Sequence, residues 1–163
     1  MDFTLDELFT FIDKAGKATY AGGGTYAEPE RSGFKELTFT KGNFTYRDSY
    51  AGFYRSRGTE VVRHKDIPIW ASLYGGGMVA GFESLAGDTF TFLKQVMLHD
   101  EAGFDSFRGP HKYSEGEWEY VYSQEGDVSE FTGYEEIRYK ADVVFTHRIM
   151  GGFIVDKYNY ETL

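Results

Sequence analysis

The chain contains an internal repeat, in which a set of strands and glycine turns returns after about 74 residues. The segment Gly42–Ser49 returns as Gly116–Ser123, and after one inserted residue Gly58–Lys65 returns as Gly133–Lys140. Glycines recur at the turns and aromatic residues recur inside the strands, so the repeated object is a supersecondary unit. The sequence therefore predicts a fold made of two similar halves.

Each half is expected to begin with a helix. Leu5, Leu8, Phe9 and Ile12 form one apolar stripe with helical spacing, and the Thr4-x-x-Glu7 pattern predicts a capping box at its start. A second amphipathic helix is predicted from Asp88 to His99, with Asp88 as its N-cap.

Short apolar and aromatic segments between turn residues predict strands in both halves. Their close spacing leaves no room for crossover helices, so the strands must form antiparallel meanders. The predicted strands are 37–40, 43–50, 59–65 and 67–74 in the first half, then 112–114, 117–123, 134–140 and 143–150, with a further strand near 154–160.

The predicted fold class is α+β, with two pseudo-symmetric helix-plus-antiparallel-meander units packed into a single domain over residues 1–163. The repeat units span about 4–82 and 88–160. Strand alternation gives each unit one aromatic-rich face, and we expect these two faces to meet as the shared interior. The opposite face of the first unit is apolar and is expected to be covered by a helix or a partner; it carries Ile67, Ile69, Ala71 and Leu73.

Composition excludes several classes of function. The formal net charge of −9 and pI near 4.9 work against direct binding to nucleic acid, which requires basic residues that neutralise phosphates. The chain has no cysteine, which excludes thiol chemistry and thiolate metal sites. The acidic N-terminal segment and the lack of a long apolar run predict a cytoplasmic protein that neither enters a membrane nor carries a secretory signal.

Two polar residues interrupt the aromatic face of the first unit. Asp48 stands where the second unit has Tyr122, and His64 stands where it has Tyr139. A carboxylate and an imidazole on such a face could anchor a ligand or form an acid/base pair. The third interpretation is structural, because buried polar groups can be satisfied by tyrosine hydroxyls or turn amides.

Two glutamates occupy equivalent places in the repeat. Glu60 and Glu135 could flank a cleft between the units, or each could pair with an arginine such as Arg31 or Arg108. His147 is expected on the interior face, where a satisfied core histidine is the alternative to a ligand-binding role.

No metal site or cofactor is expected, because the four histidines lack the spacings typical of metal ligands. The leading hypothesis is a non-enzymatic module that binds a small molecule in an aromatic-lined cleft between the units. A domain that contacts a protein partner without a ligand is the alternative, and an enzyme using Asp48 and His64 is the second alternative. The candidate ligand-binding residues are Tyr46, Asp48, Glu60, His64, Trp70, Tyr74, Tyr120, Tyr122, Glu135 and His147.

Several segments, among them Tyr46-Arg47-Asp48-Ser49-Tyr50, Arg108-Gly109-Pro110 and Gly133-Tyr134-Glu135-Glu136-Ile137, together resemble a bacterial family of uncharacterised domains. That family occurs alone or behind a Cro/C1-type helix-turn-helix. The resemblance transfers no catalytic residue, and the association with regulators implies a sensory or partner-binding role. We expect this chain to carry no helix-turn-helix of its own, because its predicted first helix leads directly into the duplicated domain. Ala141 replaces the usual turn glycine, where a positive φ would strain it.

Overall fold

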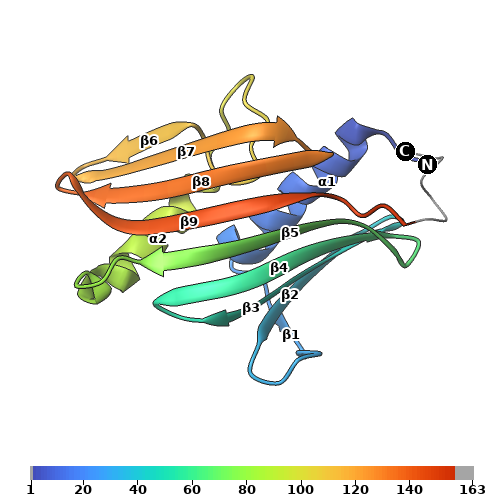
Figure 1. The fold of residues 1–163 in the computed structure, drawn as a ribbon, viewed down its shortest axis with the longest axis horizontal. Coiled ribbons are helices and arrows are strands. Elements are labelled where there is room, and N and C mark those ends of the chain that lie inside the picture. Colours follow the sequence, from blue (N-terminus) through green and yellow to red (C-terminus); the bar gives the residue numbers. More distant parts are fainter. Residues whose placement is uncertain (1, 157–163) are drawn as a thin grey trace.

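A computed structural model describes residues 2–156, which form one nine-stranded antiparallel sheet with two α-helices on one side of it (Figure 1). The strand order is β1-β2-β3-β4-β5-β9-β8-β7-β6. The first half contains β1 (Tyr26–Ala27), β2 (Lys35–Lys41), β3 (Phe44–Gly52), β4 (Arg55–His64) and β5 (Ile67–Met78). The second contains β6 (Lys112–Glu115), β7 (Trp118–Asp127), β8 (Glu130–Tyr139) and β9 (Asp142–Phe153).

The helices begin each half, as the sequence predicts. Helix α1 (Leu5–Gly16) starts with the expected capping box between Thr4 and Glu7 and continues into a π-helical turn, η1 (Lys17–Ala21). A short 3₁₀ turn, η2 (Glu83–Leu85), precedes α2 (Ala86–Val96). The predicted boundaries of the second helix were wrong, because α2 starts two residues before Asp88 and has no side-chain cap. Asp88 lies in its first turn, where its carboxylate stabilises the helix by a favourable interaction with the helix dipole.

The register of the sheet preserves the repeat. The pairing of β4 with β5 shifts between Val62 and Arg63, and the pairing of β8 with β9 shifts between Ile137 and Arg138, which are the equivalent positions. The two halves join where β5 and β9 pair, with Tyr74 opposite Ile149. Two backbone hydrogen bonds at equivalent positions of the two halves flank this junction. Val79 N–H donates to Val144 O, and Ile154 N–H donates to Ile69 O.

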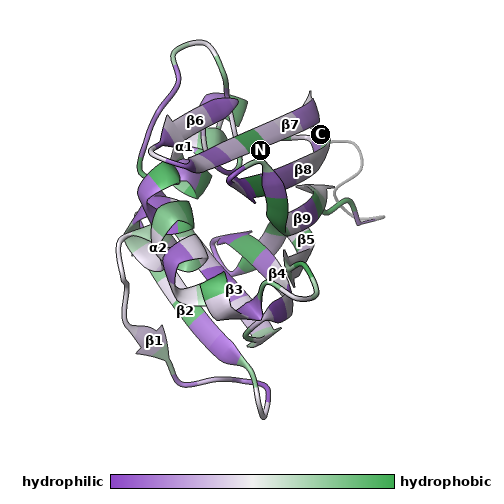
Figure 2. Ribbon diagram, turned by 90° about the vertical axis from the view of Figure 1, so that its left-hand side faces the viewer, coloured by the Kyte–Doolittle hydropathy of each residue, from purple (hydrophilic) through white to green (hydrophobic). Residues whose placement is uncertain are grey.

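The sheet curves around the helices, which lie on its concave side (Figure 2). The fold class is confirmed, but the two meanders do not face each other as separate layers. They join edge to edge through β5 and β9, so both aromatic faces line one continuous concave surface.

That concave surface carries the core. The fully or nearly fully buried apolar residues from the two aromatic faces are Tyr46, Val62, Trp70, Tyr120, Tyr122, Ile137, Phe145 and Ile149. Helix α1 adds Leu8, Phe11 and Ile12, and α2 adds Phe92, Leu93 and Val96. Both helices bury an apolar side against the aromatic side of the sheet. The predicted stripe of α1 is corrected at its start, because Leu5 is 48% exposed and Phe11 is buried.

The opposite, convex face of the first unit was expected to be covered, and it is not covered by any described helix. Ile67 is 61% exposed and Leu73 is 54% exposed. The predicted strand near 154–160 is also not formed where it can be assessed, since residues 154–156 are irregular and 157–160 lie outside the described residues. Among the helices of residues 2–156, none has the length and apolar character needed to cross a membrane.

The two hairpin turns that the repeat places at Lys65-Asp66 and Lys140-Ala141 have positive φ at both central residues. This is the type I′ geometry, which matches the twist of the flanking strands and favours glycine or asparagine. Ala141, with φ of 72°, therefore carries the backbone strain that its position in the sequence predicts.

Candidate functional site

A cavity of about 180 Å³ lies between the concave face of the sheet and the helical layer. Its floor comes from β3, β4, β5 and β9, and its roof comes from η1, α2 and the loop that precedes β6. Its deeper lining includes Tyr20, Tyr46, Asp48, Glu60, Tyr74, Phe90, Leu93, Met97, Arg108, Phe145 and His147. Tyr26 and Phe53, which are 55% and 59% exposed, also line it, so the cavity opens to solvent at their end.

Asp48 lies in the floor of this cavity on β3, directly opposite Glu60 on β4. Its side chain is buried, and the hydroxyl of Tyr74 donates a hydrogen bond of 2.7 Å to its Oδ1 atom. Among residues 2–156, its Oδ2 atom receives no hydrogen bond. Burial raises the pKa of Asp48 to about 7, and the neighbouring charge of Glu60 adds to this rise against the opposing effects of Tyr74 and Arg108.

Glu60 is held by hydroxyl groups. The hydroxyl of Tyr46 donates to its Oε1 atom at 2.7 Å, and that of Ser72, opposite it on β5, donates to Oε2. Within the described part of the chain, Glu60 makes no ion pair with a lysine, arginine or histidine.

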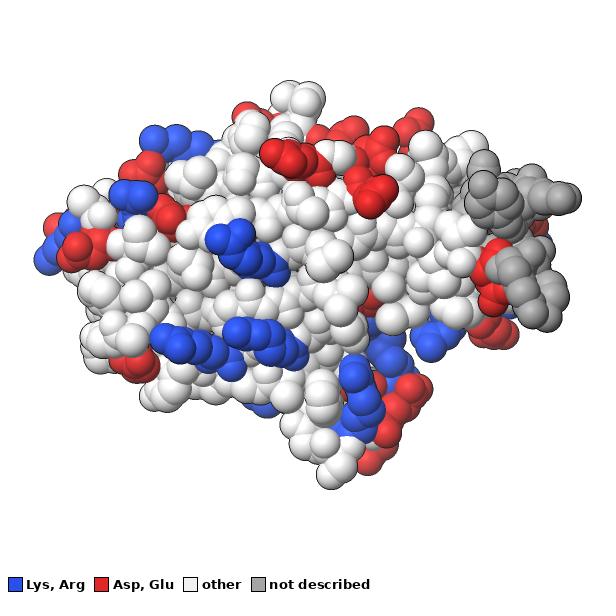
Figure 3. Space-filling view, viewed as in Figure 1, with Lys and Arg blue, Asp and Glu red and all other residues white. Residues whose placement is uncertain are grey.

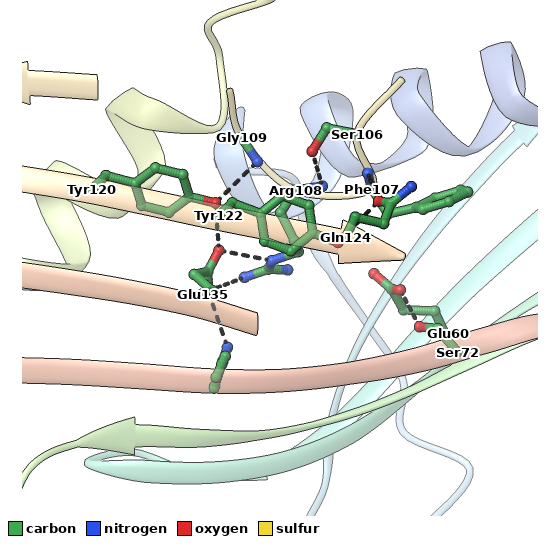
Figure 4. A network of polar contacts seen from close by, with 11 residues as sticks. Glu60, Ser72, Ser106, Phe107, Arg108, Gly109, Tyr120, Tyr122, Gln124 and Glu135 are labelled. Atoms are coloured by element: carbon green, nitrogen blue, oxygen red, sulfur yellow. Dashed lines mark hydrogen bonds and ion pairs between the residues drawn. The ribbon is translucent and has the colours of Figure 1, made fainter. Parts of the chain in front are cut away.

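Glu135, the equivalent residue in the second half, has a cationic partner. Arg108 donates to both of its carboxylate oxygens, from Nε at 3.0 Å and from an η nitrogen at 3.2 Å, and Tyr120 donates at 2.9 Å (Figure 4). Burial by itself raises the pKa of Glu135, but the charge and hydrogen bonds of Arg108, together with His147, outweigh burial and lower it to about 2. Glu135 and Arg108 therefore form a fully ionised buried pair.

The loop that carries Arg108 is fixed by side chains of β7 (Figure 4). The Gly109 N–H donates to the Tyr120 hydroxyl at 3.2 Å, and the Phe107 N–H donates to Gln124 Oε1 at 3.3 Å. A side chain at Gly109 would place a Cβ atom 2.8 Å from Val96 and 3.1 Å from the Tyr120 ring. Glycine at this position therefore lets the loop approach closely enough for Arg108 to reach Glu135.

His147 lines the cavity and is only 6% exposed. Its Nδ1 atom lies 3.3 Å from Glu135 Oε1, and neither ring nitrogen has a hydrogen-bond partner among residues 2–156. Burial lowers the pKa of His147 despite the nearby Glu135 carboxylate. The ring is therefore neutral near pH 7, with a donor and an acceptor that are unused.

Tyrosines complete the wall of the cavity. Burial raises the pKa of Tyr20 to about 12. Tyr50 and Tyr26 share a hydrogen bond of 2.9 Å near the mouth. Tyr74 fits only because Gly58, opposite it on β4, has no side chain, since a Cβ atom there would overlap the Tyr74 ring.

The structure brings half of the candidate ligand-binding residues to the cavity wall: Tyr46, Asp48, Glu60, Tyr74 and His147. Tyr120, Tyr122 and Glu135 belong to the neighbouring network around Arg108 (Figure 4). Trp70 does not line the cavity. It is fully buried, stacks on Phe131 and donates from Nε1 to the carbonyl oxygen of Val128.

His64 also lies away from the cavity. It opposes Phe44 on β3, whereas Asp48 opposes Glu60, so four residues of strand, or about 13 Å, separate His64 from Asp48 along the ladder. Its Nδ1 atom lies 3.7 Å from Asp2, and its ring packs on Phe3 and Phe44. The two residues are therefore too far apart to act directly as an acid/base pair.

An arginine partner was one of the alternatives predicted for both glutamates, and the structure shows it for Glu135. Arg108 pairs with Glu135, but Arg31 donates to Ser49 and Thr59 and does not reach Glu60. Arg108 was not predicted as part of the cavity wall. Tyr20 and Tyr50 were not proposed as site residues either, although Tyr50 lies in a segment that carries the family resemblance.

Within residues 2–156, no three His, Asp or Glu side chains are grouped so as to hold a metal ion. The family model described as "Domain of unknown function (DUF5680)" matches residues 48–154, more than half of the chain. The chain belongs to this family. The matched segment begins at Asp48 and includes Glu60, Arg108 and His147. Comparisons with curated proteins and with solved structures found no match.

Proposed function

We propose that this domain binds a small molecule in the cavity beneath α2 and η1. The observation that carries the proposal is the polar wall of the cavity, where the carboxyl group of Asp48 and the ring of His147 are both about nine-tenths buried or more and where, within residues 2–156, the His147 Nε2 atom makes no hydrogen bond. Burying such groups costs free energy unless a partner satisfies them. A ligand with matching donors and acceptors would supply that partner.

The size of the cavity limits the ligand. A cavity of about 150 Å³ holds one benzene molecule, and this one measures about 180 Å³. It therefore accommodates a compound of roughly seven or eight non-hydrogen atoms. Aromatic and aliphatic walls with a few convergent polar groups are typical of small-molecule sites.

A sensory role fits this proposal. The resemblance described from the sequence implies a regulatory context, and a ligand that joins η1, α2 and the sheet would change the relative stability of those elements. The net charge of −9 argues against direct contact between this domain and DNA.

A fragment screen by protein-observed NMR tests the proposed function. We expect fragments to shift the signals of Asp48, Glu60 and Tyr74 in the unaltered protein. The variant Ser56→Phe fills the cavity from its mouth and should abolish these shifts. The control Ser123→Phe adds the same ring on the outer face and should leave them intact. The proposal fails when no fragment shifts the cavity signals or when Ser56→Phe has no effect.

The outer face of the sheet supports a second candidate function, contact with an acidic protein. Leu73 and Met150 are paired across β5 and β9 and are 54% and 58% exposed. Together with Arg57 and Arg148 they line a broad hollow on this face. Basic side chains lie over the strands of this face, and acidic side chains lie mostly toward its edges (Figure 3). A labelled poly-glutamate peptide should bind the unaltered protein more tightly than Arg57→Glu. Equal anisotropy with both proteins would remove the support for this role.

A further inference from the structure

The equivalent glutamates of the two halves, Glu60 and Glu135, have different surroundings. In the second half, Glu135 accepts from the Tyr120 hydroxyl and from the guanidinium of Arg108. In the first half, Glu60 accepts from the equivalent tyrosine, Tyr46, but makes no ion pair within residues 2–156. It faces the cavity instead.

The charges around the cavity do not balance. Arg108 is committed to Glu135 through two hydrogen bonds, which leaves the adjacent carboxyl groups of Asp48 and Glu60 without an ion-pair partner in the described structure. Lys35 and Lys94 also line the cavity, but both side chains are exposed and reach it from solvent, and Lys94 lies over the ring of Tyr20. The deep part of the cavity therefore has an excess of negative charge.

The other walls suit a cation too. The rings of Tyr20, Tyr46, Tyr74 and Phe145 line the cavity, and aromatic rings attract ammonium and guanidinium groups through their faces. Desolvation strengthens this attraction, and the floor of the cavity is buried. His147 provides an unpartnered ring nitrogen that can accept a hydrogen bond from a donor on the ligand.

We infer that the ligand is a small organic cation, an amine or a guanidinium compound, whose charged group lies between Asp48 and Glu60 as Arg108 lies beside Glu135. This inference rests on the proposed function, because it names the class of ligand for the same cavity. Burial of Asp48 beside Glu60 raises its pKa to about 7, and a bound cation would stabilise its ionised form.

Three compounds of nearly the same shape test the inference by calorimetry: benzylamine, which is protonated at neutral pH, benzyl alcohol and sodium benzoate. We expect a dissociation constant of about 10 mM or lower for benzylamine, and at least tenfold weaker binding of the other two compounds. The variants Asp48→Asn and Glu60→Gln should each weaken benzylamine binding by about tenfold, which is more than either should weaken benzyl alcohol binding. Glu117→Gln, which removes an exposed carboxylate away from the cavity, is the matched control and should change neither.

The outcomes separate this inference from the proposed function. Preference for benzyl alcohol or benzoate would overturn the cationic ligand and keep the cavity as a binding site. Benzylamine affinity that is equal in Asp48→Asn, Glu60→Gln and the unaltered protein would also overturn it. No binding of benzylamine at about 10 mM contradicts the inference too, and the fragment screen then decides whether the cavity binds any other compound.

Discussion

Replacing Asp48 by asparagine should stabilise the protein in the absence of ligand, and the gain should grow with pH. The folded protein raises the pKa of Asp48 from 3.8 to about 7, because the carboxyl group is buried beside Glu60. A rise of about 3 units corresponds to at most roughly 4 kcal/mol of destabilisation when the group is ionised, at 1.36 kcal/mol per unit. Because water at the open cavity screens part of this cost, we expect a gain of roughly 2 kcal/mol for the variant at pH 8.

The sign follows from proton binding. Between about pH 4 and pH 7 the folded state holds a proton on Asp48 that the unfolded chain has released, so the contribution of this group to stability falls as pH rises. Asparagine does not titrate, and its Oδ1 atom can still accept the hydrogen bond from Tyr74. The stability difference between variant and parent should therefore increase from pH 5.5 to pH 7 and level off above that.

Urea denaturation at pH 5.5, 7 and 8 measures this difference. Asp127 provides a control, because it is exposed and hydrogen bonds from Ser129 lower its pKa below 3.8. Asp127 is ionised in the folded and the unfolded state from pH 5.5 to pH 8, so the difference between Asp127→Asn and the parent should stay constant over this range. An Asp48→Asn variant that is less stable than the parent at pH 8, or a difference that does not depend on pH, would refute the claim that burial of this carboxylate is costly.

Three further substitutions test the fold around the site. Ala141→Gly should relieve a φ of 72° and stabilise the protein by about 0.5–1 kcal/mol, seen as a higher Tm; an unchanged or lower Tm would contradict the strained turn. Glu135→Gln should cost about 3–5 kcal/mol by urea denaturation, because it leaves the charge of Arg108 buried without its partner; a loss below about 1 kcal/mol would show that the pair is not needed. Gly109→Ala should cost about 1–3 kcal/mol, since its Cβ atom would press on Val96 and Tyr120; a neutral effect would mean that the loop adapts.

Local patterns in the sequence predicted much of this fold. Alternation along a strand depends only on neighbouring residues, so the burial of Tyr46, Tyr120 and His147 on one face could be predicted without knowing the topology. The capping box of α1 is equally local. The duplication predicted that equivalent residues would have equivalent places, which the matching register shifts of the two halves confirm.

The arrangement of the two units depends on contacts between distant residues, and it was not predicted correctly. Two aromatic faces can be buried by facing each other or by lining one curved sheet, and alternation is the same in both cases. The difference lies in the pairing of β5 with β9, which no local pattern encodes. The same limit applies to His64, whose neighbour Asp2 is far away along the chain, and to Arg108, which reaches the cavity from a loop without periodic structure.

A crystal structure determined in the presence of benzylamine tests the central claim most directly, because it shows whether the cavity holds a ligand and which groups contact it. The account predicts the aromatic ring of benzylamine among the tyrosines of the wall, with the ammonium nitrogen within hydrogen-bond distance of the Asp48 and Glu60 carboxylates. The compound on the outer face, or in the cavity with its nitrogen directed away from both carboxylates, would contradict the account.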